Sequence, residues 1–408
     1  MTWLVDLFHS SSAGSSVLVL ALTAVLGLVI GSVRVRGVRF GIAGVLFSGL
    51  LFGHFGATIA PPVLEFARDF GLILFVYAIG IEVGPGFASS LRTRGLPLNM
   101  IAAGTVAAGA ALAVAISRAA GIAIPVAAGM FSGATTNTPS LGAVQAALSE
   151  MPGYAESMAR LPGLGYAISY PFGLLGVILS VAIARVAFRA RAGSAAVPLP
   201  SDDPPAVTAT DSPSSSAAAI SERPRSLQVL PVFIGITLGV LVGSLPIHIA
   251  SLPAPLKLGM AGGPLVVAIA LGAIGRFGPL DWRMPQAVDA TFREVGIVMF
   301  LSCVGLRSGG TFMETLLHGS GLYWMAWATL ITLIPLIAAA LVARAALGIS
   351  YPALCGLLTG SMTNPAGLAF AHSLDQSEET TQCYATVYPL TMVLRVIAAQ
   401  LIVLLFMR

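Results

Sequence analysis

Two similar stretches, GATTNTPSLGA (133–143) and GSMTNPAGLAF (360–370), interrupt long apolar segments of this 408-residue chain. In each, small and hydroxyl-bearing residues lead to a Thr-Asn pair, and a proline follows at once or after one residue. Such residues end one helix and begin another, because Thr and Asn cap helices and Pro is favoured in the first turn. The apolar runs on either side of each break, at about 121–150 and 351–375, are too short to cross a bilayer alone. We therefore predict two re-entrant hairpins, each with two half-helices that meet at a polar tip.

The rest of the chain is dominated by apolar spans. Hydrophobic residues make up 56% of the chain and charged residues 9%, whereas soluble domains carry roughly 25% charged residues. The mean hydropathy is +0.91, so lipid is the expected solvent of most of the surface. Applying a criterion of roughly 20 mostly apolar residues per crossing, we predict five spans in each half of the chain. They lie at about 17–33, 38–58, 66–84, 97–117, 163–187, 229–246, 259–275, 293–309, 322–345 and 384–406.

The two halves also match in sequence outside the hairpins. FVYAIGIEVGPGF (75–87) aligns with FLSCVGLRSGGTF (300–312), and ISYPFGLLGVI (168–178) aligns with TVYPLTMVLRVI (386–397). Together with the hairpins, these are three matches in the same order, which indicates an internal repeat. The expected fold class is an all-α membrane protein with two inverted repeats, each of five transmembrane helices plus one re-entrant hairpin, of the elevator type.

The domain organisation follows from the repeat. The first membrane repeat is expected at residues 1–191 with its hairpin at 121–150, and the second at 227–408 with its hairpin at 351–375. Between them, residues 192–226 are rich in Ser, Pro, Ala and Asp and lack apolar periodicity, which predicts a disordered linker.

The arginines predict the orientation of the halves in the membrane. An odd number of crossings per repeat makes the halves face opposite ways. With both termini outside, the inner loops carry most of the arginines, and this distribution favours a cytoplasmic linker. The outer loops then carry only Arg68, Arg118, Arg160 and Lys257. No basic residue precedes Arg34, so the first span is expected to be a true helix and not a cleavable signal peptide.

Several classes of protein are disfavoured by the sequence. The arginines cluster at span ends and not on a phosphate-binding face, so no nucleic-acid partner is expected. Cys303, Cys355 and Cys383 are far apart and lack metal or redox spacing, so no metal and no cofactor are expected. The chain contains no GxSxG, no HExxH and no paired intramembrane aspartates, so it is not expected to be an enzyme.

The hairpin tips are the candidate substrate site. Thr138 is the expected N-cap and Pro139 the first-turn residue of one half-helix, and Asn364 and Pro365 play these parts in the other. Half-helices that begin in mid-membrane expose free N–H groups and a positive dipole end, which suit a carboxylate or phosphate. The alternative is that the caps only satisfy a kinked helix. The candidate residues at the tips are Thr135, Thr136, Asn137, Thr138, Pro139, Thr363, Asn364 and Pro365.

Ionisable residues within the spans are the second group of candidates, because placing one there costs about 2.5 to 3.5 kcal/mol. Arg395 lies inside the last span and is expected to neutralise an anionic substrate. Arg307 occupies the repeat position of Glu82, and these two are either substrate-binding residues, interfacial anchors or a mutual ion pair. Tyr170 and its repeat counterpart Tyr388 either place a hydroxyl beside each hairpin or pack at a proline kink.

The chain resembles the aspartate-alanine exchanger family of bacterial secondary transporters. The residues that carry the likeness are GATTNTPSLGA (133–143), YAISYPFGLLGVIL (166–179), GLLTGSMTNPAGLAFA (356–371) and YATVYPLTMVLRVI (384–397). The resemblance implies exchange of amino acids or dicarboxylates across the bacterial plasma membrane by an elevator-like movement in a homodimer. Family members usually carry two small cytoplasmic regulatory domains between the halves, where this chain has only residues 192–226.

Two other transport functions remain open from the residues alone. An ion-coupled symporter or efflux carrier for an organic anion would use the same tips. An ion channel could also use mid-membrane half-helices, but it would not need two hairpins that come from opposite faces.

Overall fold

The computed structural model describes residues 12–407, with gaps at 36–37, 40, 58, 91–94, 152, 190–224, 247–256, 279 and 375–376. The linker expected at 192–226 therefore lies outside the described residues, except for its last two, which begin a helix.

The described residues are almost entirely helical. The first half contains α2 (Ala13–Ser32), α3 (Ala43–His54), α4 (Pro61–Ser90), α5 (Leu96–Ala120), α6 (Ile124–Ala134), α7 (Thr138–Ser149), the short helix η1 (Glu156–Met158) and α8 (Leu161–Arg189). The second half contains α10 (Arg225–Ser244), α11 (Gly259–Ile274), α12 (Gln286–Leu317), α13 (Gly321–Val342) with its π-helical end η2 (Ala343–Leu347), α14 (Tyr351–Ser361), α15 (Pro365–Leu374) and α16 (Glu378–Phe406). Two antiparallel pairs of two-residue strands, β1 (Arg34–Val35) with β2 (Val38–Arg39) and β3 (Arg276–Phe277) with β4 (Leu280–Asp281), complete the fold.

Seven of these helices are long and apolar enough to cross a membrane, namely α2, α4, α5, α8, α12, α13 and α16. They correspond to seven of the ten spans expected from the sequence. The other three spans contain shorter apolar helices, Ala43–His54 (α3), Val229–Ser244 (within α10) and Gly259–Ile274 (α11), and the largest difference is at 38–58, where α3 has only 12 residues. At 1.5 Å per residue this helix is about 18 Å long, well short of a bilayer core. Gly41 and Gly56 flank it with left-handed φ values of 58° and 81°, which end the helical run.

The centre of one group of helices is the crossing of α4 with α12. A Cβ atom at Gly71 would meet the backbone of α12 at Gly296, and one at Gly296 would meet α4 at Gly71 and Phe75, so only glycine permits this approach. Gly71 of α4 lies near Phe300 of α12, and Glu82 of α4 pairs with Arg293 of α12. Residue numbers therefore rise along α4 as they fall along α12, so the two helices are antiparallel. Helix α11 packs along α4, and α3 packs along α12, so each half of the chain lies against the other.

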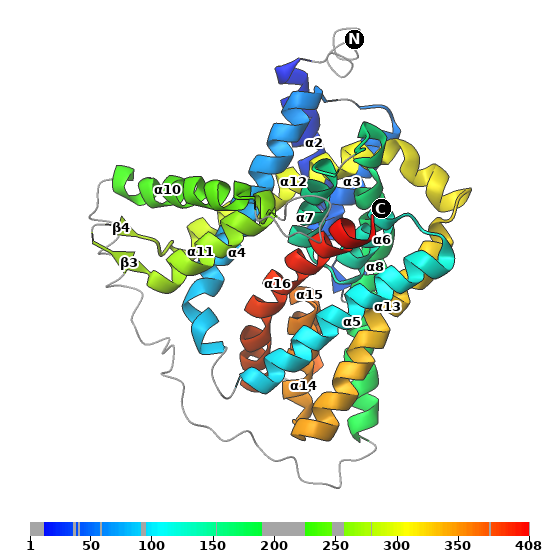
Figure 1. The fold of residues 1–408 in the computed structure, drawn as a ribbon, viewed down its shortest axis with the longest axis vertical. Helices are drawn as coiled ribbons and strands as arrows, with labels where there is room; N and C mark the ends of the chain where they lie inside the picture. The colour runs from blue at the N-terminus through cyan, green and yellow to red at the C-terminus, as the bar shows by residue number, and fades with distance from the viewer. Residues whose placement is uncertain are drawn as a thin grey trace.

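The second group of helices surrounds the two hairpins. Helix α6 packs on α8 and α14 packs on α16, while α5 lies against α16 and α13 lies against α8. Figure 1 shows α6 and α7 in the upper part of the molecule and α14 at the lower end, with α15 between α14 and the first hairpin. The two hairpins therefore extend toward each other from opposite ends, and their tips lie inside the protein.

Candidate functional site

The tips are the most unusual backbone in the described part of the chain. Thr136 and Thr363, which align in the sequence repeat, have φ values of 52° and 50°, and no other described non-glycine residue has a positive φ. A residue held in the left-handed region costs about 1–3 kcal/mol, and a branched Cβ makes that region less favourable still. Strain of this size at equivalent places in two hairpins indicates a functional rather than an accidental geometry.

Asparagine caps both second half-helices. The Asn137 side chain accepts a hydrogen bond from the Ser140 N–H at 2.9 Å, and the Asn364 side chain accepts one from the Gly367 N–H at 2.7 Å. The expected cap Asn364 is thus confirmed, whereas the expected cap Thr138 is wrong by one residue. Thr138 is already helical because the left-handed Thr136 turns the chain earlier, and its hydroxyl instead contacts the Tyr166 hydroxyl at 2.9 Å.

The two tips contact each other directly. The Thr136 hydroxyl donates to the Met362 carbonyl at 3.0 Å, and the Asn137 amide donates to the Thr363 hydroxyl at 3.1 Å. These pairs join residues 226 positions apart in the chain. Any ligand at the tips would therefore contact both halves of the protein at once.

Arg395 of α16 is fully buried beside the second tip. Its Nε donates to the Ser361 carbonyl at 3.1 Å, and its Nη2 donates to the same oxygen. Ser361 is the last residue of α14, so the guanidinium lies at the negative end of that half-helix dipole. The Phe131 ring lies 5.8 Å from the guanidinium carbon and adds a cation–π contact.

The second tip holds donors that the protein leaves unused. The Asn364 Nδ2, the Arg395 Nη1 and the Ser361 Oγ are all buried without a hydrogen-bond partner in the described part of the chain. At the first tip the equivalent Asn137 Nδ2 is already taken by Thr363. An unpaired buried donor costs about 1–3 kcal/mol, so a ligand with acceptor oxygens would recover that energy.

The two second half-helices also differ in exposure. Thr138 and Pro139, at the start of α7, are buried, whereas Pro365 and Ala366, at the start of α15, are exposed. The packing explains this difference, since α7 lies against α11 and α16. The positive end of α15 is thus the accessible one of the two.

The tyrosines around the tips come in pairs. Tyr166 packs on Tyr170 with ring centroids 5.4 Å apart, and Tyr384 stacks on Tyr388 at 5.3 Å. The hydroxyl that reaches a hairpin is that of Tyr166, one helical turn before the expected Tyr170. Tyr166 was missed by the sequence interpretation, although the equivalent spacing of the two tyrosine pairs, 166/170 and 384/388, was a usable signal.

Glu82 pairs with Arg293, whose Nη1 lies 2.5 Å from the Glu82 Oε2. The expected alternative of a mutual ion pair between Glu82 and Arg307 is therefore wrong. The two residues lie on opposite sides of the Gly71–Gly296 crossing, because α4 and α12 run antiparallel.

Groups of His, Cys, Asp or Glu that could hold a metal ion do not occur among the described residues. The three cysteines are buried and form no disulfide with one another. The chemistry that the tips offer is therefore hydrogen bonding and charge, from amides, hydroxyls, one guanidinium and a helix N-terminus.

Comparison with known proteins gives a consistent result. Residues 19–186 and 231–404 match the family described as predicted permease membrane region. A protein of Photobacterium profundum, named as a putative transport protein, is 35% identical over 548 aligned positions, which cover 97% of this chain and 99% of that protein. A relative from Edwardsiella ictaluri, also named as a putative transport protein, is 36% identical with the same coverage. Both alignments exceed the 408 residues of this chain, so these relatives contain residues that have no counterpart here.

Proposed function

This chain belongs to the aspartate-alanine exchanger family of membrane permeases, and we propose that it is a secondary active transporter that exchanges amino acids or dicarboxylates across the bacterial plasma membrane. The observation that carries this proposal is the meeting of two capped, left-handed Thr-Asn tips inside the protein. Symmetry-related tips that come from opposite ends are what alternating access between two faces requires.

A carboxylate is the substrate group that best fits the tips. In the proposed complex its oxygens accept from the Asn364 amide, the Arg395 Nη1 and the Ala366 N–H in the first turn of α15. Hydrogen bonds to a charged group contribute about 1.5–3 kcal/mol each, so two or three of them can hold a small anion. The amino group of an amino acid would then lie toward the hydroxyls of the tips.

The exposure of α15 indicates which of the two hairpins is accessible from outside the protein. We infer that α5 to α8 and α13 to α16 form the moving body, and that the helices around the α4–α12 crossing form the fixed one. In this structure α7 is closed against the fixed α11, while the start of α15 is exposed. An elevator-like movement would expose the start of α7, bury the start of α15 and carry the tips across the membrane. A homodimer joined through the fixed body would suit such a movement.

Opposite insertion of the halves predicts where single cysteines can be labelled. In intact cells, a cysteine at position 155 is expected to react with a membrane-impermeant maleimide, and a cysteine at position 210 only after lysis. The reason is that the bilayer separates the loop before α8 from the linker if the termini are outside. The native cysteines are buried, so the cysteine-containing parent protein gives the background. Labelling of both positions from the same face would refute the inverted arrangement.

Exchange itself is tested by counterflow in proteoliposomes. With L-aspartate or L-alanine inside, uptake of the labelled compound is expected to be at least tenfold faster than into empty vesicles, because an obligatory exchanger returns only in the loaded state. An ion-coupled symporter or efflux carrier would instead give equal uptake into loaded and empty vesicles, and this uptake would be lost when the ion gradients are removed. Single-channel currents would identify a channel.

A further inference from the structure

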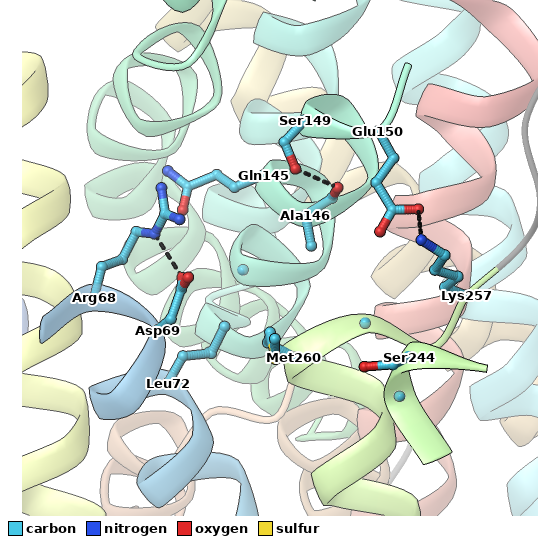
Figure 2. A pocket seen from close by; sticks show the side chains of 13 residues that line it. Arg68, Asp69, Leu72, Gln145, Ala146, Ser149, Glu150, Ser244, Lys257 and Met260 are labelled. Carbon is cyan, nitrogen blue, oxygen red and sulfur yellow. Dashed lines mark hydrogen bonds and ion pairs between the residues drawn. The ribbon is translucent and has the colours of Figure 1, made fainter. Parts of the chain in front are cut away.

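A polar cavity lies away from the tips. It has a volume of about 210 Å³ and is lined by α4, the C-terminal ends of α7 and α10 and the N-terminal end of α11 (Figure 2). Leu72 and Gly142 are part of its lining, and a Cβ atom at Gly142 would overlap the Leu72 side chain. Leu72 and Leu141 also belong to the apolar core that includes Met392, whose sulfur contacts Asn137 at the first tip. Packed apolar side chains therefore separate the cavity from the tips.

The charges around the cavity are balanced. At one side Arg68 and Asp69 of α4 form an ion pair at 2.8 Å, and at the other Lys257 and Glu150 form one at 3.1 Å (Figure 2). All four side chains are partly exposed, so each can also interact with a ligand. A dianion would leave two charges uncompensated in this surrounding, whereas a molecule with one positive and one negative group would leave none.

The helix ends make one part of the cavity electrostatically negative and another part positive. Ser149 is the last residue of α7 and Ser244 the last of α10, so negative dipole ends meet the cavity there. Gly259 and Met260 open α11, so its positive end and its first N–H groups meet the cavity at another point. This arrangement favours an ammonium group near α7 and α10 and a carboxylate near α11.

One side chain in the cavity lacks a partner. The Gln145 Oε1 is buried and accepts no hydrogen bond from the described residues. It lies one helical turn before Ser149 on α7. An ammonium group is a donor that would satisfy this oxygen, which lies on the side of the cavity where Figure 2 shows Arg68 and Asp69.

We propose that this cavity binds a small zwitterion of the α-amino acid class, with its ammonium group on the Gln145 Oε1 and its carboxylate at the start of α11. A volume of about 210 Å³ is enough for a solute of this size, since one water molecule needs only about 10–15 Å³ on the same measure. The proposal rests on the proposed transport function only in choosing α-amino acids as the class of solute. Binding there does not require that transport occurs.

The test uses a reporter at the cavity rim in the full-length protein. Ser149 lines the cavity and is exposed, and the native cysteines are buried, so a Ser149→Cys protein can be labelled at one place by a charged maleimide. Saturating L-alanine is expected to slow labelling at least fivefold. Succinate at the same concentration, which is a dianion, and ethylammonium, which is a cation, are expected to slow it less than twofold.

Two further variants locate the effect. Gln145→Leu in the Ser149→Cys protein is expected to weaken protection by L-alanine at least tenfold, with an unchanged unfolding temperature as the control for folding. Asn364→Ala, which removes the donor at the second tip, is expected to leave protection intact while it abolishes counterflow. Protection by L-alanine in a protein that transports nothing would support the cavity and count against the transport proposal.

Three results would overturn the proposal for the cavity. The first is normal labelling of the Ser149→Cys protein in saturating L-alanine, even if counterflow is observed. The second is equal protection by succinate, which would show a general anion site. The third is loss of protection in Asn364→Ala, which would show that labelling reports only a movement driven from the tips.

Discussion

Arg395→Lys is expected to raise the apparent substrate constant at least tenfold, about 1.4 kcal/mol of lost binding, and Arg395→Ala is expected to be inactive. The arginine uses Nε and Nη2 on the Ser361 carbonyl and keeps Nη1 without a partner among the described residues. A lysine can still place a positive charge at the end of α14, but it cannot bind that carbonyl and present a second N–H in a fixed direction. The lysine variant should therefore fold and bind its substrate weakly.

The measurement is substrate-dependent thermal stabilisation of the purified proteins, beside initial rates of counterflow at equal folded fraction. Arg344→Lys is the matched control, because Arg344 also donates to a backbone carbonyl, that of Ile349 at 3.1 Å, but lies away from the tips. The control is expected to transport normally. If Arg395→Ala still bound the anion with unchanged affinity, Arg395 would be restricted to capping α14, and the start of α15 would be the remaining anion-binding element.

Asn364→Ser is expected to lower substrate affinity about 10- to 100-fold with little change in the unfolding temperature. Serine caps a helix about as well as asparagine, so the bond to the Gly367 N–H can be retained. What serine lacks is the Asn364 Nδ2, which is one of the three unused donors at the second tip. A hydrogen bond to a charged acceptor contributes about 1.5–3 kcal/mol, which is the basis of the expected range. Asn364→Asp, which keeps the cap but adds a negative charge, should abolish binding of an anion.

Serine at Asn137 is expected to have a different effect from serine at Asn364, so comparing the two variants tests which asparagine faces the substrate. The Asn137 Nδ2 donates to Thr363, so Asn137→Ser removes a contact between the two tips and is expected to lower the unfolding temperature as well as transport. A tip-to-tip hydrogen bond contributes about 0.5–1.5 kcal/mol. Alanine at either position, which also removes the cap, is expected to abolish uptake. Equal behaviour of the two serine variants in both measurements would contradict the assignment of Asn364 as the substrate-facing amide.

The strain at the tips has a consequence for transport. Thr136 and Thr363 hold left-handed conformations that cost energy, and each lies in a hydrogen bond between the tips. Each of these hydrogen bonds helps to hold the strained backbone of its threonine in place. A movement that separated the tips would break both bonds and leave both strained conformations without this support. We therefore expect the two tips to move together, with the substrate between them.

The sequence by itself predicted the membrane class, most of the long helices, both interrupted hairpins and the membership in the family. These properties depend on the hydropathy of about 20 consecutive residues, on caps within a few residues of a helix start and on motif similarity, all of which are local in the chain. The cap at Asn364 was predictable for this reason, and the cap at Asn137 was missed by one residue because a left-handed threonine is not visible in composition.

Only the tertiary structure decided which of these elements meet. The contact of Asn137 with Thr363, the pairing of Glu82 with Arg293 and the capping of α14 by Arg395 join residues 226, 211 and 34 positions apart. The same holds for the cavity around Gln145, to which four helices from both halves contribute. Contacts of this kind depend on the direction in which helices cross, as at Gly71 and Gly296, and on which hairpin is packed closed. Neither the crossing direction of the helices nor the closed state of a hairpin is encoded in a single segment, because both depend on the packing of the whole molecule.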